Sequence, residues 1–125
     1  MKIYIAGIRG MVGSAIAREA LSRGAEVVGK PSTALNLTNR ESVFKELAKE
    51  SPDVLVIAAA RVGGIGANSK HPVEFLSENL QIQTNLMDAA NSAGIAKNTF
   101  LGFFMCLSKT SNPTYARRCS THWPA

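Results

Sequence analysis

The sequence predicts an α/β domain in which a parallel sheet carries helices on both faces. Short apolar runs alternate along the chain with segments in which apolar residues recur at helical spacing. The run at residues 54–60 contains no polar side chain, as expected for a strand that is buried on both faces of a sheet. Because strands that alternate with helices join through right-handed crossovers, we predict a doubly wound parallel sheet.

The first part of the chain is expected to form two strands around one helix. Residues 2–6 are a short apolar run that stops at Gly7, as a buried parallel strand would. Small and apolar residues at helical spacing predict a helix over residues 14–21, which Gly24 closes. Residues 26–28 then predict a second short strand.

The next part is expected to repeat this alternation. Residues 41–49 have apolar side chains on one side of a helix, and residues 54–60 predict a buried strand. Pro72 opens a long helix that ends near Gly94, and Thr99 begins another strand. If no strand follows outside this last one, we expect it to expose an apolar edge and the chain to be prone to aggregation.

Length and composition favour one globular domain and exclude several classes of protein. The chain has 125 residues, of which 46% are hydrophobic and 18% are charged. No apolar run is long enough to span a bilayer and no signal-type segment is present, so we expect a cytoplasmic protein without a membrane partner. Cys106 and Cys119 are too few for a disulfide framework and have no partners at metal-ligand spacing.

The net charge of +5 does not indicate a nucleic-acid partner. Of the 14 basic residues, Lys109, Arg117 and Arg118 lie in residues 103–125, which contain no acidic residue. Residues 1–102 show no basic stripe with interleaved aromatic residues and no known nucleic-acid module. The basic character therefore belongs mostly to residues 103–125, and no nucleic-acid partner is expected.

A glycine-rich turn between the first strand and the first helix is the main chemical motif. Gly7 permits a tight turn, Gly10 lets the backbone approach a pyrophosphate, and Gly13 allows close packing of helix on strand. The N–H groups at the helix N-terminus can bind an anion. The three glycines alone would equally suit a plain turn, but their place between strand and helix favours dinucleotide binding.

The residues around this turn favour NADP over NAD. An NAD site usually has an acid at the end of the second strand, where it holds the ribose 2′-hydroxyl. Here Lys30 follows that strand, and Arg9 lies within the glycine-rich turn. Both cations suit a 2′-phosphate, although Lys30 alone would equally fit a solvated surface charge.

Several stretches of the chain resemble the GDP-L-fucose synthase family of the extended short-chain dehydrogenases/reductases. They are residues 7–16, 35–38, 58–68, 79–85 and 100–102. The most specific is residues 58–68, which read AAARVGGIGAN where the family typically has AAAKVGGIxANN. The resemblance is collinear from residue 2 to 102 and implies a Rossmann fold that is incomplete at its C-terminal half.

The resemblance also implies an activity, a cofactor and partners. The family epimerises GDP-4-keto-6-deoxymannose at C3 and C5 and reduces its C4 ketone with NADPH, so a GDP-sugar is the implied substrate of the full-length parent. A homodimer built through long helices is implied for the parent, and the state of this chain stays open. Residues 1–102 are then the NADP-binding half, in which Asn85 holds neighbouring loops and takes no part in the chemistry.

The residues that the resemblance assigns to binding fall into two groups. The implied cofactor-binding residues are Gly7, Ile8, Arg9, Gly10, Met11, Val12, Gly13, Lys30, Ala58, Ala59 and Ala60. Gly63 and Gly64 are the implied substrate-binding residues, although without the family match a flexible turn would explain them equally well.

The resemblance stops at Gly102. The family continues with SSC(I/V)YPK and a later YxxxK, which supply the hydroxyl acid, the second donor and the cation for hydride delivery. Here Phe103 and Phe104 stand in place of the serines, and no YxxxK follows. Reading plausible codons one base later turns residues 103–109 into SSCVYPK, so we interpret residues 103–125 as an out-of-frame tail.

The sequence therefore predicts that this chain alone has no catalytic residues, no metal and weak NADP binding at best. Two alternatives stay open. One is another sugar-nucleotide epimerase or dehydratase, against which residues 62–65 and 67–69 argue. The other is a non-catalytic dinucleotide-binding module with a genuine tail, which a stable fold that binds NADPH without turnover would favour.

Overall fold

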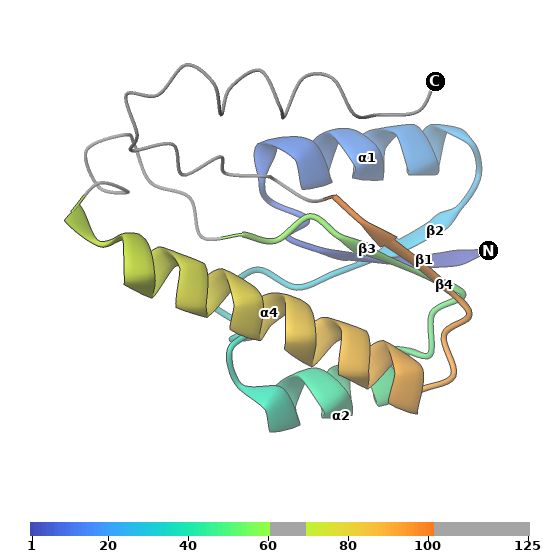
Figure 1. Ribbon diagram of the computed structural model, residues 1–125. Coiled ribbons are helices and arrows are strands. Elements are labelled where there is room, and N and C mark those ends of the chain that lie inside the picture. Colours follow the sequence, from blue (N-terminus) through green and yellow to red (C-terminus); the bar gives the residue numbers. More distant parts are fainter. Residues whose placement is uncertain (61–69, 102–125) are drawn as a thin grey trace, which may run out of the picture.

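The computed structural model describes residues 1–60 and 70–101, which form a four-stranded parallel sheet with helices on both faces (Figure 1). The strands are β1 (Lys2–Ala6), β2 (Glu26–Val28), β3 (Val54–Ile57) and β4 (Lys97–Phe100), in the order β2-β1-β3-β4. The helices are α1 (Met11–Ser22), α2 (Arg40–Glu50) and α4 (Pro72–Ser92). The predicted doubly wound α/β sheet is confirmed.

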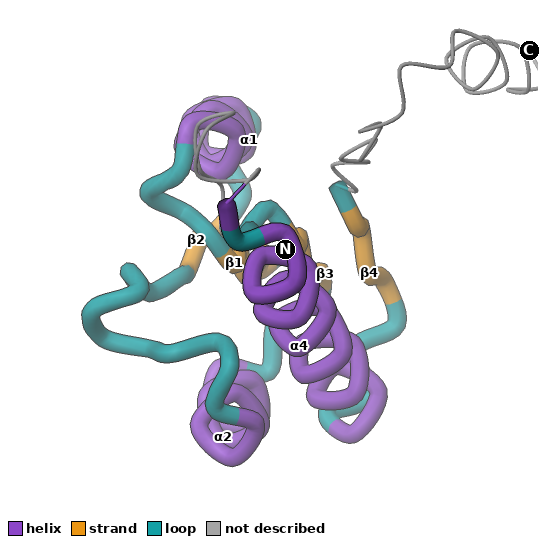
Figure 2. Tube along the Cα trace, turned by 60° about the vertical axis from the view of Figure 1, so that its left-hand side comes forward, coloured by secondary structure: helices purple, strands orange, loops and turns teal. Residues whose placement is uncertain are grey.

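The strand order explains why both faces are covered. The chain passes from β1 outward to β2, and then back across β1 to β3. Because crossovers between parallel strands are right-handed, these opposite directions place α1 on one face and α2 and α4 on the other. Figure 2 shows this arrangement, with the sheet between α1 and the pair formed by α2 and α4. The point where the direction reverses lies between β1 and β3, at the carboxyl ends of which such folds bind ligands.

Two cores fill the space between the sheet and its helices. On the face of α2 and α4, Tyr4 and its register partner Leu55 pack with Leu47 and Leu86, and all four are buried. On the face of α1, Ile5 and its partner Val56 pack with Ala17. Side chains along each strand therefore alternate between the two cores, which explains why β1 and β3 are apolar throughout.

Three element boundaries differ from the expected ones by two residues or more. Helix α1 begins at Met11 rather than at residue 14, because Gly10 has extended backbone angles and caps it. Strand β3 ends at Ile57, and β4 begins at Lys97, two residues before the expected start.

Strand β4 is an edge strand among the described residues, but its edge is mostly polar. Its sequence is KNTF, and Phe100 is the large apolar side chain that it exposes, at 46%. The expected apolar edge is thus limited to Phe100 in residues 97–100. No helix in the described part of the chain is long and apolar enough to cross a membrane.

Candidate functional site

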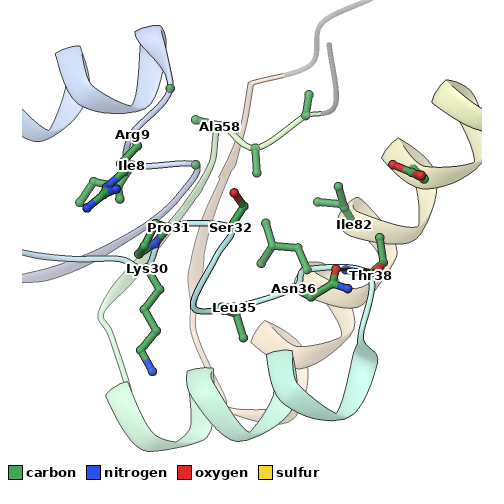
Figure 3. Close-up of a pocket in the computed structure, with 16 residues that line it drawn as sticks. Ile8, Arg9, Lys30, Pro31, Ser32, Leu35, Asn36, Thr38, Ala58 and Ile82 are labelled. Carbon is green, nitrogen blue, oxygen red and sulfur yellow. Dashed lines mark hydrogen bonds between the residues drawn. The ribbon is translucent and has the colours of Figure 1, made fainter. Parts of the chain in front are cut away.

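A cavity of about 480 Å³ lies at the carboxyl ends of β1 and β3, where the chain reverses direction across the sheet (Figure 3). Its walls come from the turn after β1, the segment after β2, the alanines after β3 and one face of α4. The lining residues are Gly7, Ile8, Arg9, Gly10, Lys30, Pro31, Ser32, Leu35, Asn36, Leu37, Thr38, Ala58, Ala59, Ala60, Glu78 and Ile82.

The glycine-rich turn is shaped by close contacts of backbone with backbone. Gly7 has a φ of 87°, and a Cβ on it would lie 2.8 Å from the backbone of Ala59. A Cβ on Gly13 would lie 2.0 Å from the Gly7 carbonyl oxygen, so only glycine lets α1 approach the turn. The N–H of Gly10 donates to the Gly7 carbonyl at 2.9 Å and closes the turn. These contacts fix the start of α1 at the cavity.

The N-terminus of α1 is suited to an anion. Its cap, Gly10, offers no side chain to the first N–H groups, and the first turn carries no acidic residue. The first N–H groups of a helix have no intrahelical acceptor, and the helix dipole adds a partial positive charge there. Together with Arg9 at the cavity wall, this end of α1 can bind a phosphate or pyrophosphate group.

Lys30 lines the cavity, but its charge is paired with that of an acidic residue. Its Nζ lies 2.7 Å from Oε2 of Glu46 on α2, and the Glu46 side chain is 7% exposed. In Figure 3 the Lys30 side chain runs toward α2 and away from Arg9 and Ser32. The structure therefore brings Arg9 and Lys30 to one cavity, as the sequence predicts, and adds an acidic partner that the sequence pattern did not reveal.

Asn85 holds the cavity wall that follows β2. Its buried side-chain amide donates to the carbonyl oxygens of Leu37 at 3.0 Å and Thr38 at 3.1 Å. Within the wall, the Asn36 carboxamide oxygen accepts from the backbone N–H of Thr38 at 3.0 Å and from its hydroxyl at 2.6 Å. The expected role of Asn85, to hold a neighbouring loop, is confirmed.

Most of the predicted site residues meet at this cavity, and some do not. The predicted cofactor residues Gly7, Ile8, Arg9, Gly10, Lys30, Ala58, Ala59 and Ala60 line it. Met11, Val12 and Gly13 form the first turn of α1 and are not lining residues; Met11 is 86% exposed. Gly63 and Gly64, predicted for substrate, lie outside the described residues, as does the tail at 103–125.

Sequence reasoning missed the wall at residues 31–38 as part of the site. Pro31, Ser32 and Leu35 line the cavity, but their residue types alone do not indicate a binding role. The one available signal was the family resemblance of residues 35–38, which pointed to this loop without assigning it a role.

Comparisons with known proteins find relatives over most of this chain. The model of the NAD dependent epimerase/dehydratase family matches residues 3–105. A probable GDP-L-fucose synthase 1 from Oryza sativa subsp. japonica is 48% identical over 103 residues, which cover 81% of this chain and 31% of that protein. GDP-L-fucose synthase 1 from Arabidopsis thaliana is 44% identical over 102 residues, with 81% and 32% covered. The chain thus spans about a third of the length of the curated relatives it matches.

A solved structure is similar over most of the chain. It is a GDP-D-glycero-L-gluco-heptose synthase from Campylobacter jejuni, determined in the presence of NADPH. The TM-score is 0.77 at 31% sequence identity, and the match covers 90% of this chain and 33% of the other.

Proposed function

The chain belongs to the NAD dependent epimerase/dehydratase family, and on this basis we propose that residues 1–102 bind NADP as the cofactor-binding part of a GDP-L-fucose synthase. The observation that carries the proposal is the cavity at the β1–β3 reversal, where the N-terminus of α1 and Arg9 meet. The named GDP-L-fucose synthases among the relatives support the substrate class.

The proposal assigns each part of the cofactor to a group of residues. The residues from Gly7 to Gly13 would hold the pyrophosphate, because they place the uncapped start of α1 against the cavity. Arg9 would meet the 2′-phosphate, and the three alanines after β3 would border the riboses. Bound NADPH would supply a hydride, while Gly63 and Gly64 would let the backbone approach the GDP-sugar.

Binding is tested by titrating the 125-residue chain with NADPH and NADH and following nucleotide fluorescence. We expect NADPH to bind more tightly than NADH, and Arg9→Met to weaken NADPH binding by about tenfold and NADH binding by clearly less. Arg18→Met, which removes an exposed cation from α1 and does not line the cavity, is the matched control. A chain that binds neither nucleotide contradicts the proposal.

We propose that this chain does not complete the reaction by itself. Phe103 and Phe104 occupy the positions at which the resembled family has its hydroxyl groups, so no residue of this chain is assigned a catalytic role. The expected result is binding of NADPH without its oxidation when GDP-4-keto-6-deoxymannose is added. NADPH oxidation that depends on this substrate would refute it. Because the proposed ligands are intracellular nucleotides, a cytoplasmic location belongs to the same proposal.

We further propose that the full-length parent is a homodimer that associates through α4. An apolar stripe of Val73, Leu76, Leu80 and Met87 recurs at helical spacing on this helix and is 50–73% exposed. A shallow groove runs along the same face and is lined in part by Thr84. An exposed apolar stripe of this kind is typical of a surface that another chain covers.

Sedimentation velocity tests this interface. The parent protein is expected to sediment as a dimer, and Leu76→Glu combined with Leu80→Glu is expected to convert it to a monomer. A dimer that persists in the double variant would place the interface elsewhere.

A further inference from the structure

Glu46 holds Lys30, one of the two cations that the sequence assigns to the 2′-phosphate. The carboxylate reaches Lys30 from the neighbouring helix α2, and the two charged atoms lie 2.7 Å apart. The Glu46 side chain is 7% exposed and that of Lys30 is 38% exposed, so the acid is fixed in the interior and the ammonium lies at its border with solvent. The lysine is therefore the partner that is able to move.

This ion pair changes the charge that the cavity presents to a nucleotide. In many NAD sites an acid at the end of the second strand binds the ribose 2′-hydroxyl, and a cation there accommodates a 2′-phosphate. Here the end of β2 carries the cation, but Glu46 cancels its charge from the side of α2. Figure 3 shows the Lys30 side chain directed toward that helix and away from Arg9. Of the two cations Arg9 and Lys30, only Arg9 then remains to attract a 2′-phosphate.

The buried side chain of Tyr4 on β1 lies near the carboxylate of this pair. The Tyr4 hydroxyl has no hydrogen-bond partner among the described residues. Its pKa is raised first by burial and then by the nearby carboxylates of Glu46 and Glu50. The phenol therefore stays protonated and can donate to the Glu46 carboxylate if the Lys30 ammonium leaves. A buried carboxylate that loses its cation is strongly destabilised unless another donor replaces it.

We propose that Glu46 is a positioning residue that sets the cofactor preference, because it holds the Lys30 ammonium on α2 and lowers the advantage of NADP over NAD. Lys30 reaches the 2′-phosphate only by giving up this ion pair, and the Tyr4 hydroxyl then takes its place on Glu46. The inference rests on the proposed nucleotide binding and adds to it the residue that tunes specificity.

Glu46→Gln tests the proposal in the 125-residue chain. It keeps the shape of the side chain, removes the negative charge and releases Lys30. We expect the dissociation constant for NADPH to fall by about fivefold and that for NADH to change by less than about twofold. Glu41→Gln is the matched control, because it removes an acid that pairs with Lys45 on the exposed side of the same helix. It is expected to leave both constants unchanged.

A second set of variants separates this effect from a loss of folding. When Glu46→Gln is added to a chain that already carries Lys30→Met, neither the NADPH nor the NADH dissociation constant is expected to change, since no ammonium remains to be released. Tyr4→Phe is expected to weaken NADPH binding by about threefold with NADH unaffected, because Glu46 then lacks its replacement donor. The unfolding temperature of each variant is measured by circular dichroism, and Tyr4→Phe decides the question if Glu46→Gln alone does not fold.

The outcomes distinguish the two proposals. An unchanged ratio of the two constants in Glu46→Gln, or an equal shift in both, overturns the role of Glu46 and leaves NADP binding intact. A shift for NADPH that persists in the Lys30→Met background also overturns it, because the effect would not pass through Lys30. If the unsubstituted 125-residue chain binds neither nucleotide, the proposed function is contradicted and the specificity role of Glu46 fails with it.

Discussion

Gly13 joins the first turn of α1 to the turn after β1 at a distance that leaves no room for a side chain. A Cβ there would lie 2.0 Å from the Gly7 carbonyl oxygen and 2.7 Å from its carbon, both of which belong to backbone. We predict that Gly13→Ala lowers the free energy of unfolding by about 3 kcal/mol and abolishes nucleotide binding, because the start of α1 must move away from the cavity. Urea unfolding and NADPH titration measure the two effects.

Ser14→Ala is the control for this prediction, because Ser14 is the next residue of α1 and its hydroxyl donates to the Met11 carbonyl within the same turn. It is expected to change the free energy of unfolding by less than about 1 kcal/mol. A Gly13→Ala variant that binds NADPH normally would show that the turn does not place the nucleotide.

Tyr4 gives the protein a specific weakness at alkaline pH. Burial, reinforced by the Glu46 and Glu50 carboxylates, raises the pKa of its hydroxyl above the ordinary value of 10.0. Above that value the unfolded state releases the phenolic proton while the folded state keeps it, so the unfolded state binds fewer protons and stability falls as pH rises. The contribution is fully present below pH 10 and is lost progressively above it.

Tyr4→Phe tests this dependence. We predict that the free energy of unfolding declines less steeply between about pH 10 and 11.5 in the variant than in the unsubstituted 125-residue chain. At pH 7 the variant is expected to differ by less than about 1 kcal/mol, since the hydroxyl that it removes has no partner among the described residues. Chemical unfolding at a series of pH values provides the comparison, and parallel curves would show that Tyr4 titrates normally.

At the scale of elements, helix α4 supports the cavity by holding the segment between β2 and α2. The Asn85 amide is the link, since it donates to two carbonyl oxygens of that segment. We predict that Asn85→Ala costs about 2 kcal/mol of stability, because two half-buried carbonyl oxygens lose their donor. NADPH affinity should fall as well, because the wall at residues 36–38 loses its anchor. Gln81→Ala on the same helix, which removes an exposed bond to Ser77, should change neither quantity.

The elements also show what the sequence can and cannot predict. The strands, the helices and the glycine-rich turn depend on local patterns: apolar runs, helical spacing and glycines at fixed positions. The pairing of Lys30 with Glu46 joins residues that are sixteen positions apart and of which neither belongs to a motif. The wall at residues 31–38 is equally hidden, because its role depends on the bonds from Asn85. The predicted start of β4 was two residues late because residues 97 and 98 are polar, and an edge strand need not be apolar.

At the scale of the whole molecule, the described sheet and its ligand cavity are formed by residues within 1–60 and 70–101. β1 and β3 form the centre of the described sheet, and the cavity opens at their carboxyl ends. The family match ends at residue 105, close to the point where the resemblance to GDP-L-fucose synthases stops. The proposed NADP-binding half therefore lies before residue 103, and the segment of different composition lies after residue 102.

We propose that a shift of reading frame near codon 102 explains this division. Residues 103–125 hold both cysteines, the single tryptophan and no acidic residue, unlike the rest of the chain. They lie outside the described residues, so the proposal rests on the sequence and on the end of the family match. Resequencing the gene across codons 100–126 is expected to find one missing or extra base, after which the frame reads SSCVYPK and continues well beyond codon 126.

The protein from the corrected frame provides the functional test of this idea. It is expected to oxidise NADPH when GDP-4-keto-6-deoxymannose is supplied, because the restored serines and the later tyrosine and lysine would provide the acid and donors that hydride delivery requires. The 125-residue chain is expected to bind NADPH without oxidising it. Gly13→Ala in the restored protein should remove the activity, since the same turn must hold the cofactor. A longer natural frame that still encodes Phe-Phe-Met-Cys at residues 103–106 would refute the frameshift and favour a dinucleotide-binding module with a tail of its own.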